Sequence, residues 1–391
     1  MKKTNNNRIS SIDTLRGIVM VLMVLDHVRM YFHKDAFMFN PADLSQSKVI
    51  LFWTRFITHF CAPIFVFLAG TSAFFVSQRK RKKETSFWLL KRGIWLVLAE
   101  ITIIKLAWTF QLDYNTIVLQ VIWVLGIGMM LLAAFIHFPK RIMIITSLLV
   151  VFGHNILDSF PIFDTTNYMY VFLHKLAILN INDMTVFAAY PLIPWVFLMP
   201  LGYYLGELYH KKYSKKHRKE ILLYIGAICI ALFLLLRGFT NYGDPNLWSE
   251  QSTLGLTVAS FFNASKYPPS LLYLLITIGP SLLFLGLFEN WNNKLSNKLE
   301  IIGRVPMFFY ILHLYVIHLL ALIAALVTGF DSSSMIIDLW VTMQKSLKGY
   351  GFNLLATYII WLFVTISLYP LCEKYNEYKT NNRTKWWLSY L

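Results

Sequence analysis

Charged residues are scarce in this sequence, and acidic ones especially so. Asp, Glu, Lys and Arg make up 14% of the 391 residues, whereas soluble domains carry about 25%. Hydrophobic residues make up 57%. This composition excludes an ordinary soluble enzyme and predicts a protein that lies in a lipid bilayer.

Cysteine is nearly absent, with three residues in the chain. Cys61, Cys229 and Cys372 lie in apolar segments at no metal-like spacing, so we expect small buried side chains and neither a disulfide framework nor a metal site. A small-residue cleavage site is also lacking at the first apolar run, so no cleavable signal peptide is expected.

Lys and Arg outnumber Asp and Glu by 36 to 20, which gives a formal net charge of +16. The basic residues form short clusters between apolar runs, a pattern typical of membrane orientation, and we expect no nucleic-acid partner. By the positive-inside rule both termini are cytoplasmic, and a bacterial cytoplasmic (inner) membrane is the expected location. The clusters occur at Lys2, Lys3 and Arg8, and then at 79–83, 140–141, 210–219, 294–304 and 374–385.

Ten apolar segments are long enough to cross a bilayer as helices of about 20 residues. The predicted fold class is all-α, a polytopic membrane protein with about ten transmembrane helices in a single domain over residues 1–391. The segments lie near residues 14–33, 51–78, 86–107, 117–138, 142–158, 185–209, 220–239, 269–289, 305–328 and 353–372.

The first apolar segment carries polar residues that a plain membrane anchor would not need. Arg16 and His27 share one helix face with Met20 and Met23, and they lie about 16 Å apart at helical rise. That distance is comparable to a phosphopantetheine arm, so Arg16 is a candidate phosphate contact and His27 a candidate base. The alternatives are that Arg16 pairs with Asp13 to anchor the helix end and that His27 packs against a neighbouring helix.

Asp26 precedes His27, but adjacent residues on a helix point about 100° apart. Arg29 or Arg55 is therefore the expected partner of Asp26. In the second segment Arg55 and His59 share a face at the level of His27. Arg55 is a candidate contact for a phosphorylated co-substrate, and His59 is a candidate contact for the other substrate. The alternatives are that Arg55 only snorkels to the interface and that His59 only packs.

The last third of the chain supplies further candidates. Tyr310 and His313 share a face of the ninth segment, and His313 lies about 13 Å above Arg304, near the midplane. Arg304, just before this segment, is either a phosphate or nucleotide contact or ordinary interfacial charge. Lys266 and Tyr267 lie in an extracytoplasmic loop stiffened by two prolines, where they bind an acceptor or anchor the interface.

Four stretches carry a resemblance to a known family: SIDTLRGIVMVLMVLDH, THFCAPIFVFLAGTSAFF, KYPPSLLYLL and GRVPMFFYILH. They resemble the heparan-α-glucosaminide N-acetyltransferase-type family of transmembrane acyltransferases, over residues 8–78 and parts of 266–318. The resemblance implies acetyl-CoA as cytoplasmic donor and co-substrate. It also implies transfer of the acetyl (acyl) group to an amine or hydroxyl of a sugar or glycan acceptor on the far side.

The resemblance also bears on the identity of the base. In the related O-antigen acetylases a histidine at the end of this helix is catalytic, and His27 occupies the matching position. The lysosomal member instead uses a histidine in the following loop, where this chain has His33 at a different spacing. We favour His27, with His33 as the alternative. The candidates are thus, for catalysis, His27, Asp26, His33 and His313; for the donor, Arg16, Arg55, Arg304 and Tyr310; and for the acceptor, His59, Lys266 and Tyr267.

Two other functions fit the sequence. A proton-coupled membrane transporter would use the same intramembrane histidines together with Glu100, a residue that a structural pair explains equally well. A non-catalytic scaffold of an envelope assembly would make the histidines incidental. The sequence leaves open the acceptor, N- versus O-acylation, direct transfer versus an acyl-enzyme, and the formation of a homo-oligomer.

Overall fold

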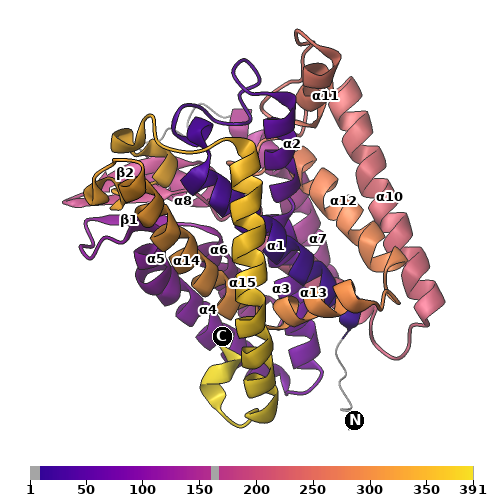
Figure 1. The fold of residues 1–391 in the computed structure, drawn as a ribbon. Helices are drawn as coiled ribbons and strands as arrows, with labels where there is room; N and C mark the ends of the chain where they lie inside the picture. Colours follow the sequence, from indigo (N-terminus) through magenta and orange to yellow (C-terminus); the bar gives the residue numbers. More distant parts are fainter. Residues whose placement is uncertain (1–8, 160–166, 391) are drawn as a thin grey trace.

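The computed structural model describes residues 9–159 and 167–390, and these residues are mainly helical (Figure 1). The basic residues Lys2, Lys3 and Arg8, which entered the orientation argument, lie outside the described residues. The prediction of a helical protein is therefore confirmed for the described part of the chain.

Helix α1 (Ser10–Phe32) is the central helix, and 18 of its 23 residues are buried. It packs against α13 (Lys294–Arg304), α14 (Pro306–Val327) and α15 (Leu354–Asn381). Figure 1 shows α15 in front of α1 and α13 crossing near the start of α1. The side chains of α1 therefore face protein along most of the helix.

The crossing of α1 and α13 is close because glycine faces backbone on both sides. A Cβ atom on Gly17 would lie 1.9 Å from the carbonyl oxygen of Leu299, and one on Gly303 would lie 1.9 Å from that of Asp13. Any larger side chain would push the helices apart. The contact brings the end of α13, with Arg304, beside the first turns of α1.

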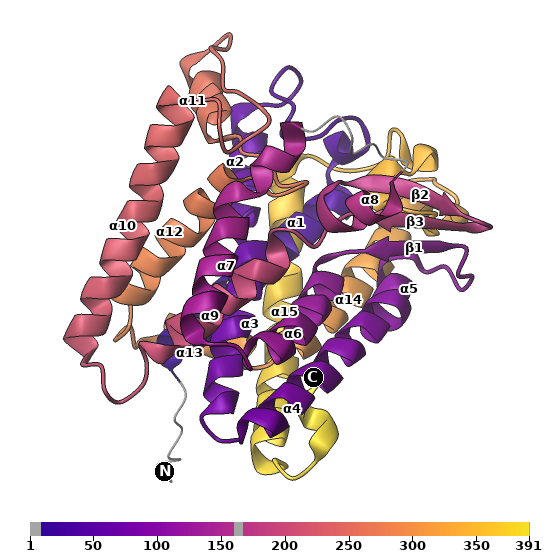
Figure 2. The same cartoon turned by 180° about the vertical axis from the view of Figure 1, so that it is seen from behind.

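The other helices pack mainly in pairs around this centre: α3 against α9, α4 against α6, and α10 against α12. Figure 2 shows the α4–α6 and α10–α12 pairs from behind. A π-helical turn at Glu100–Ile104 joins α4 to α5. These helices are α2 (Val49–Thr58), α3 (Cys61–Ser77), α4 (Lys82–Ala99), α5 (Lys105–Thr109), α6 (Val121–Phe135), α7 (Lys140–Gly153), α8 (Tyr168–His174), α9 (Trp195–Glu207), α10 (Lys215–Phe239), α11 (Leu254–Phe262) and α12 (Leu271–Leu287).

A three-stranded sheet corrects the all-α prediction. Its central strand β3 (Met184–Ala188) runs parallel to β1 (Thr116–Leu119) and antiparallel to β2 (Ala177–Ile181). The predicted spans 117–138 and 185–209 thus begin in strands, and their helices begin only at α6 and α9. The cause is that β-branched and aromatic residues are as apolar as helix formers, so a hydropathy window does not separate them.

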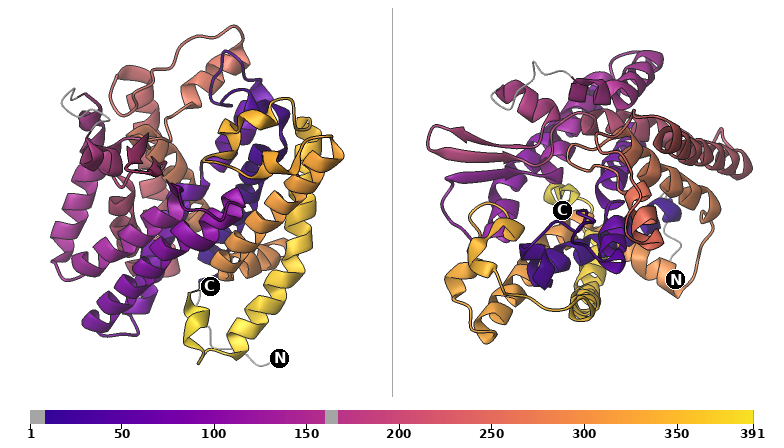
Figure 3. Two further views of the ribbon diagram at one scale, coloured as in Figure 1. Left: turned by 90° about the vertical axis from the view of Figure 1, so that its left-hand side faces the viewer. Right: turned by 90° about the horizontal axis from the view of Figure 1, so that it is seen from above.

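The two ends of the molecule differ in character. The junctions after α3 and α9 and the segment after α15 lie at the lower end in Figure 1, whereas the sheet lies toward the upper end. Seen from above, the sheet projects on the side opposite to α10 (Figure 3). The basic clusters that follow α3, α9 and α15 are therefore on one side of the protein.

By length and composition, five of the described helical stretches can cross a membrane, so the prediction of ten spans is not confirmed. Two further apolar helices, α6 and α12, are shorter. The central helix α1 falls outside the five because it carries four charged residues. The five stretches are Val49–Ser77, Lys140–Asp158, Lys215–Phe239, Pro306–Val327 and Leu354–Asn381.

Candidate active site

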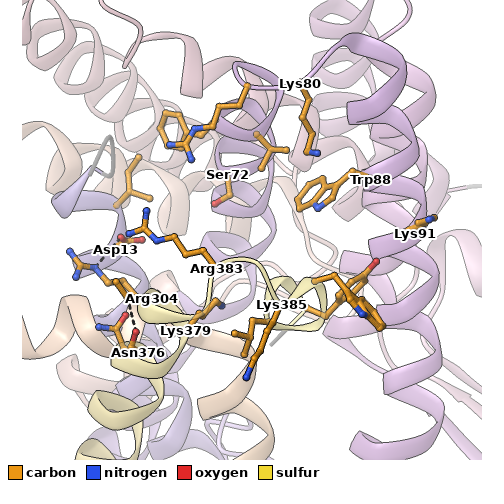
Figure 4. A pocket seen from close by; sticks show the side chains of 18 of the residues that line it. Asp13, Ser72, Lys80, Trp88, Lys91, Arg304, Asn376, Lys379, Arg383 and Lys385 are labelled. Atoms are coloured by element: carbon orange, nitrogen blue, oxygen red, sulfur yellow. Dashed lines mark hydrogen bonds and ion pairs between the residues drawn. The ribbon is translucent and has the colours of Figure 1, made fainter. Parts of the chain in front are cut away.

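A cavity of about 1110 Å³ lies at the lower end of the molecule (Figure 4). We call it the basic vestibule, because among the described residues eight Lys and Arg side chains line it and only two carboxylates do. The cations come from α1, the α3–α4 junction, α4, α13, the end of α15 and the segment that follows it: Arg16, Arg79, Lys80, Lys91, Arg304, Lys379, Arg383 and Lys385.

Arg16 lies at the inner wall of the vestibule. Its guanidinium donates to Asp13 Oδ1 at 2.8 Å, to the Gly303 carbonyl at 3.0 Å and to Ser72 Oγ at 2.9 Å. Arg304 pairs with Glu300, and its Nε lies 3.7 Å from Asp13 Oδ2. The Asp13 pair is thus confirmed, and the same arginine also faces the cavity.

A second cavity, of about 360 Å³, continues inward from the vestibule. We call it the apolar passage. The two cavities share six lining residues: Arg16, Ser72, Val76, Trp88, Arg304 and Lys379. Beyond them the walls are mainly apolar: Met20, Met23, Phe65, Leu96, Val121, Ile122, Leu125, Met129 and Met307.

A third, small cavity of about 40 Å³ contains the candidate chemistry, and we call it the histidine pocket. It shares Met23, Phe65, Val121 and Tyr310 with the apolar passage. The shared walls place the three cavities next to one another, in a series that ends at His27. The polar residues that line the pocket include Asp26, His27, Lys266, Tyr267, Tyr310, Tyr190 and Gln120.

Two histidines form a hydrogen-bonded pair at this pocket. His27 Nδ1 lies 2.8 Å from His313 Nε2, and His313 Nδ1 lies 2.8 Å from the Phe309 carbonyl oxygen. A carbonyl oxygen only accepts, so Nδ1 of His313 carries the proton and its Nε2 accepts from His27 Nδ1–H. The chain of donors leaves the lone pair of His27 on Nε2. The ring of His27 also lies edge-on against Trp108, with centroids 4.7 Å apart.

Asp26 lies in an ion-pair network rather than against His27. Arg55 Nη1 is 2.7 Å from Asp26 Oδ2, and Arg29 Nη2 is 3.0 Å from Oδ1. All three side chains are buried. The expected pairing of Asp26 with Arg29 or Arg55 is confirmed, and both arginines take part. The network fastens α1 to α2 one residue before the candidate base.

Lys266 and Tyr267 enter the pocket from the loop before α12. The Lys266 ammonium lies 5.1 Å from the ring centre of Tyr267 and 5.9 Å from that of Tyr190. Burial raises the pKa of the Tyr267 phenol, but the cations of Lys266 and Arg55 outweigh burial and hold that pKa below its usual value. The loop therefore contributes a cation and a polarised phenol opposite His27.

Other candidates lie outside the walls of this pocket. His33 Nδ1 accepts from the Asp35 backbone N–H at 3.3 Å, at the turn that follows α1. His59 packs its ring against Tyr273, with centroids 5.5 Å apart. The carboxylate of Glu100 accepts from the backbone N–H groups at the start of α6, a structural role.

A comparison with protein families identifies the family of the chain. Residues 8–235 match the family described as heparan-alpha-glucosaminide N-acetyltransferase, catalytic. The chain belongs to this family. The predicted resemblance is thereby confirmed, and this member of the acetyltransferase family is an integral membrane protein with several apolar spans. A comparison with curated proteins found no match.

Sequence reasoning missed several residues that line the cavities of this family member. Ser72 binds Arg16, Trp108 contacts His27, and Tyr190 faces Lys266. Ser72 and Tyr190 lie apart from the charged and histidine-bearing helix faces, and Trp108 is one aromatic residue among many, so the sequence gave no reason to select them. The cations of the C-terminal segment were visible in the sequence, but only as an orientation signal.

Proposed function

We propose that this chain is a membrane acyltransferase that moves an acetyl (acyl) group from cytoplasmic acetyl-CoA to an amine or hydroxyl of an extracytoplasmic sugar or glycan. The adjacent series of vestibule, passage and histidine pocket supports this proposal. Phosphates bind in the vestibule, the uncharged pantetheine arm fills the passage, and the thioester reaches His27. The helix from Arg16 to His27 rises about 16 Å, which suits such an arm.

His27 is the general base of this proposal. The acceptor nitrogen or oxygen attacks the thioester carbonyl carbon while His27 Nε2 takes the acceptor proton. The tetrahedral intermediate then collapses, the carbon–sulfur bond breaks, and the proton passes from His27 to the thiolate of CoA. An amide or ester, free CoA and neutral histidine result, so this route needs no acyl-enzyme.

The neighbours of His27 have distinct roles in this scheme. His313 is a positioning residue, because its lone pair fixes the proton of His27 on Nδ1. The Lys266 cation stabilises negative charge on the attacked carbonyl oxygen. Asp26 holds two arginines in place and stays out of proton transfer. Arg16 and Arg304 contact donor phosphates, and Tyr310 lines the path between passage and pocket.

Donor binding and turnover test this function separately. Detergent-purified protein is titrated with acetyl-CoA by calorimetry, and release of free CoA thiol is followed with a panel of hexosamines and hexoses. We expect Arg16→Ala to weaken acetyl-CoA binding about tenfold, or about 1.4 kcal/mol. His27→Asn retains binding and loses turnover, whereas the matched control His33→Asn is mild.

Each remaining outcome contradicts a stated part of the proposal. The reverse pattern for the two histidines assigns the base to His33 and the following loop. Absence of acetyl-CoA binding by folded protein rejects the acyltransferase. Uptake of a hexosamine into proteoliposomes without CoA consumption would then favour the proton-coupled transporter.

A further inference from the structure

Tyr310 is a polar side chain at the boundary between the apolar passage and the histidine pocket. Among the described residues the two cavities share four, and the other three, Met23, Phe65 and Val121, carry no side-chain hydrogen-bond donor. Tyr310 is buried, at 5% exposed, and the centre of its ring lies 6.3 Å from that of His27. A thioester that reaches His27 from the passage therefore passes the Tyr310 hydroxyl.

Trp108 also lines the histidine pocket, and its neighbours hold it in place. Its ring stacks on Tyr31 and on Trp340, with centroids 5.9 and 5.8 Å away. Its backbone carbonyl accepts from the Tyr31 hydroxyl at 2.6 Å. These contacts fix the direction of the Trp108 indole N–H.

The indole of Trp108 and the phenol of Tyr310 form an incomplete chain of hydrogen-bond donors. The Trp108 N–H is buried and makes no hydrogen bond of regular geometry to the described residues, but it interacts with the Tyr310 hydroxyl. An indole nitrogen only donates, so the Tyr310 oxygen is the acceptor in this contact. The Tyr310 O–H is then directed away from Trp108. Because buried donors are normally hydrogen-bonded, this arrangement points to an acceptor on a ligand in the pocket.

We propose that the Tyr310 hydroxyl donates a hydrogen bond to the oxyanion that forms from the thioester carbonyl, with Trp108 as its positioning residue. This inference rests on the proposed function, since the oxyanion belongs to the acetyl group of the donor. When the acceptor attacks, an electron pair of the C=O bond moves to oxygen, and that oxygen accepts from Tyr310. The C=O bond then re-forms as the carbon–sulfur bond breaks. The thiolate takes the proton from His27, and Tyr310 keeps its own proton throughout.

Tyr310 and Lys266 act on the oxyanion from different sides. Lys266 comes from the loop before α12 and lines the histidine pocket without lining the passage. Its charge acts over a distance, whereas an oxyanion site also needs a donor aimed at the oxygen. Tyr310 lies where the donor enters and supplies that directed hydrogen bond.

The experiment compares acetyl-CoA with its dithioester analogue, in which sulfur replaces the carbonyl oxygen. Sulfur is a weak hydrogen-bond acceptor, so a hydrogen-bond donor at this position favours the oxygen substrate. Release of CoA thiol by the full-length protein in detergent is followed for both substrates, with the hexosamine that gives the fastest release. Calorimetry gives the affinity for acetyl-CoA.

Tyr310→Phe keeps the ring and removes the hydroxyl. It is expected to lower kcat with acetyl-CoA by about 10²–10³-fold and the ratio of acetyl-CoA to dithioester turnover by at least about tenfold, with unchanged affinity for acetyl-CoA. Trp108→Phe is expected to change the same ratio in the same direction, but less. The matched control is Tyr315→Phe on the same helix. It loses a bond to the Ile103 carbonyl outside the three cavities, so kcat and the ratio should be retained.

The outcomes separate this inference from the proposed function. If the native protein turns over acetyl-CoA but Tyr310→Phe keeps the native kcat or the native ratio, the acyltransferase stands and the assignment of Tyr310 is wrong. A loss of acetyl-CoA affinity with unchanged kcat would overturn it as well, because Tyr310 would then only bind the donor. If Tyr310→Phe fails to fold, judged by its Tm, an unchanged ratio in Trp108→Phe overturns the proposal. Native protein that does not bind acetyl-CoA removes both proposals.

Discussion

Removing His313 tests the argument that a hydrogen-bonded pair fixes the base. In the native protein His27 Nδ1 donates to His313 Nε2 at 2.8 Å, in a buried site. His313→Ala removes an interaction worth about 1 kcal/mol and leaves a buried N–H whose desolvation costs about 1–3 kcal/mol. The His27 ring then escapes that cost by turning or by changing tautomer, which takes the lone pair on Nε2 away from the acceptor.

A loss of about 1–3 kcal/mol corresponds to a fall in kcat of about 5- to 150-fold. Loss of the base itself in His27→Asn is expected to cost about 10²–10⁴-fold. The initial rate of CoA thiol release at saturating substrate gives kcat for each variant. Calorimetry gives the affinity for acetyl-CoA, which should not change in His313→Ala. His174→Ala, another buried histidine, controls for general loss of packing.

The double variant decides between a positioning residue and a second independent acid or base. Because His313 acts through His27, the double variant His27→Asn with His313→Ala should be no slower than His27→Asn alone. If the two losses in kcat multiply in the double variant, His313 is not a positioning residue that acts through His27. Unchanged turnover in His313→Ala would contradict that role as well. Either result would show that the 2.8 Å contact does not set the state of His27.

Three further predictions concern the frame around the site. Asp26→Asn leaves two buried guanidinium groups unpaired and should lower stability by about 3–5 kcal/mol, seen as a lower Tm in detergent; an unchanged Tm would contradict a buried pair. Gly202→Ala places a Cβ 1.9 Å from the Phe67 carbonyl and should cost at least about 1–3 kcal/mol, whereas Gly153→Ala meets nothing within 4 Å and should be neutral or stabilising. Ala69→Trp narrows the apolar passage and should abolish the formation of free CoA from acetyl-CoA, while calorimetry should still detect CoA binding. Full turnover would show that the thioester reaches His27 by another path.

Helical periodicity predicted the part of the site that lies on one helix. Arg16, Met20 and Met23 line the apolar passage, and Met23 and His27 line the histidine pocket, as their shared face implied. The prediction holds because 3.6 residues per turn fix relative direction within a helix whatever surrounds it. The same rule separates Asp26 from His27 and places Arg29, three residues on, beside Asp26.

Contacts between distant segments were beyond such reasoning. Glu100 is bound by the start of a helix 20 residues later, and no local pattern distinguishes that role from a functional carboxylate. Tyr190 and Lys266 come together from two separate loops. Hydropathy predicts helix for most of the strands Thr116–Leu119 and Met184–Ala188, because a short apolar run fits either element until its pairing partner is known.

The distribution of charge among the helices explains why an Asp–His pair is tolerated in an apolar segment. Two of the five stretches long and apolar enough to cross a membrane have little burial inside the protein: 22% of the most apolar part of Lys215–Phe239 and 17% of that of Leu354–Asn381, whereas Val49–Ser77 reaches 61%. Helix α1 is the opposite case, with 18 of 23 residues buried and four charges along it. Its environment is protein rather than lipid, so its carboxylates meet arginines and its histidine meets another histidine. A helix that would insert poorly by itself is thus the one best placed to carry polar chemistry, because its neighbours supply the partners that lipid does not.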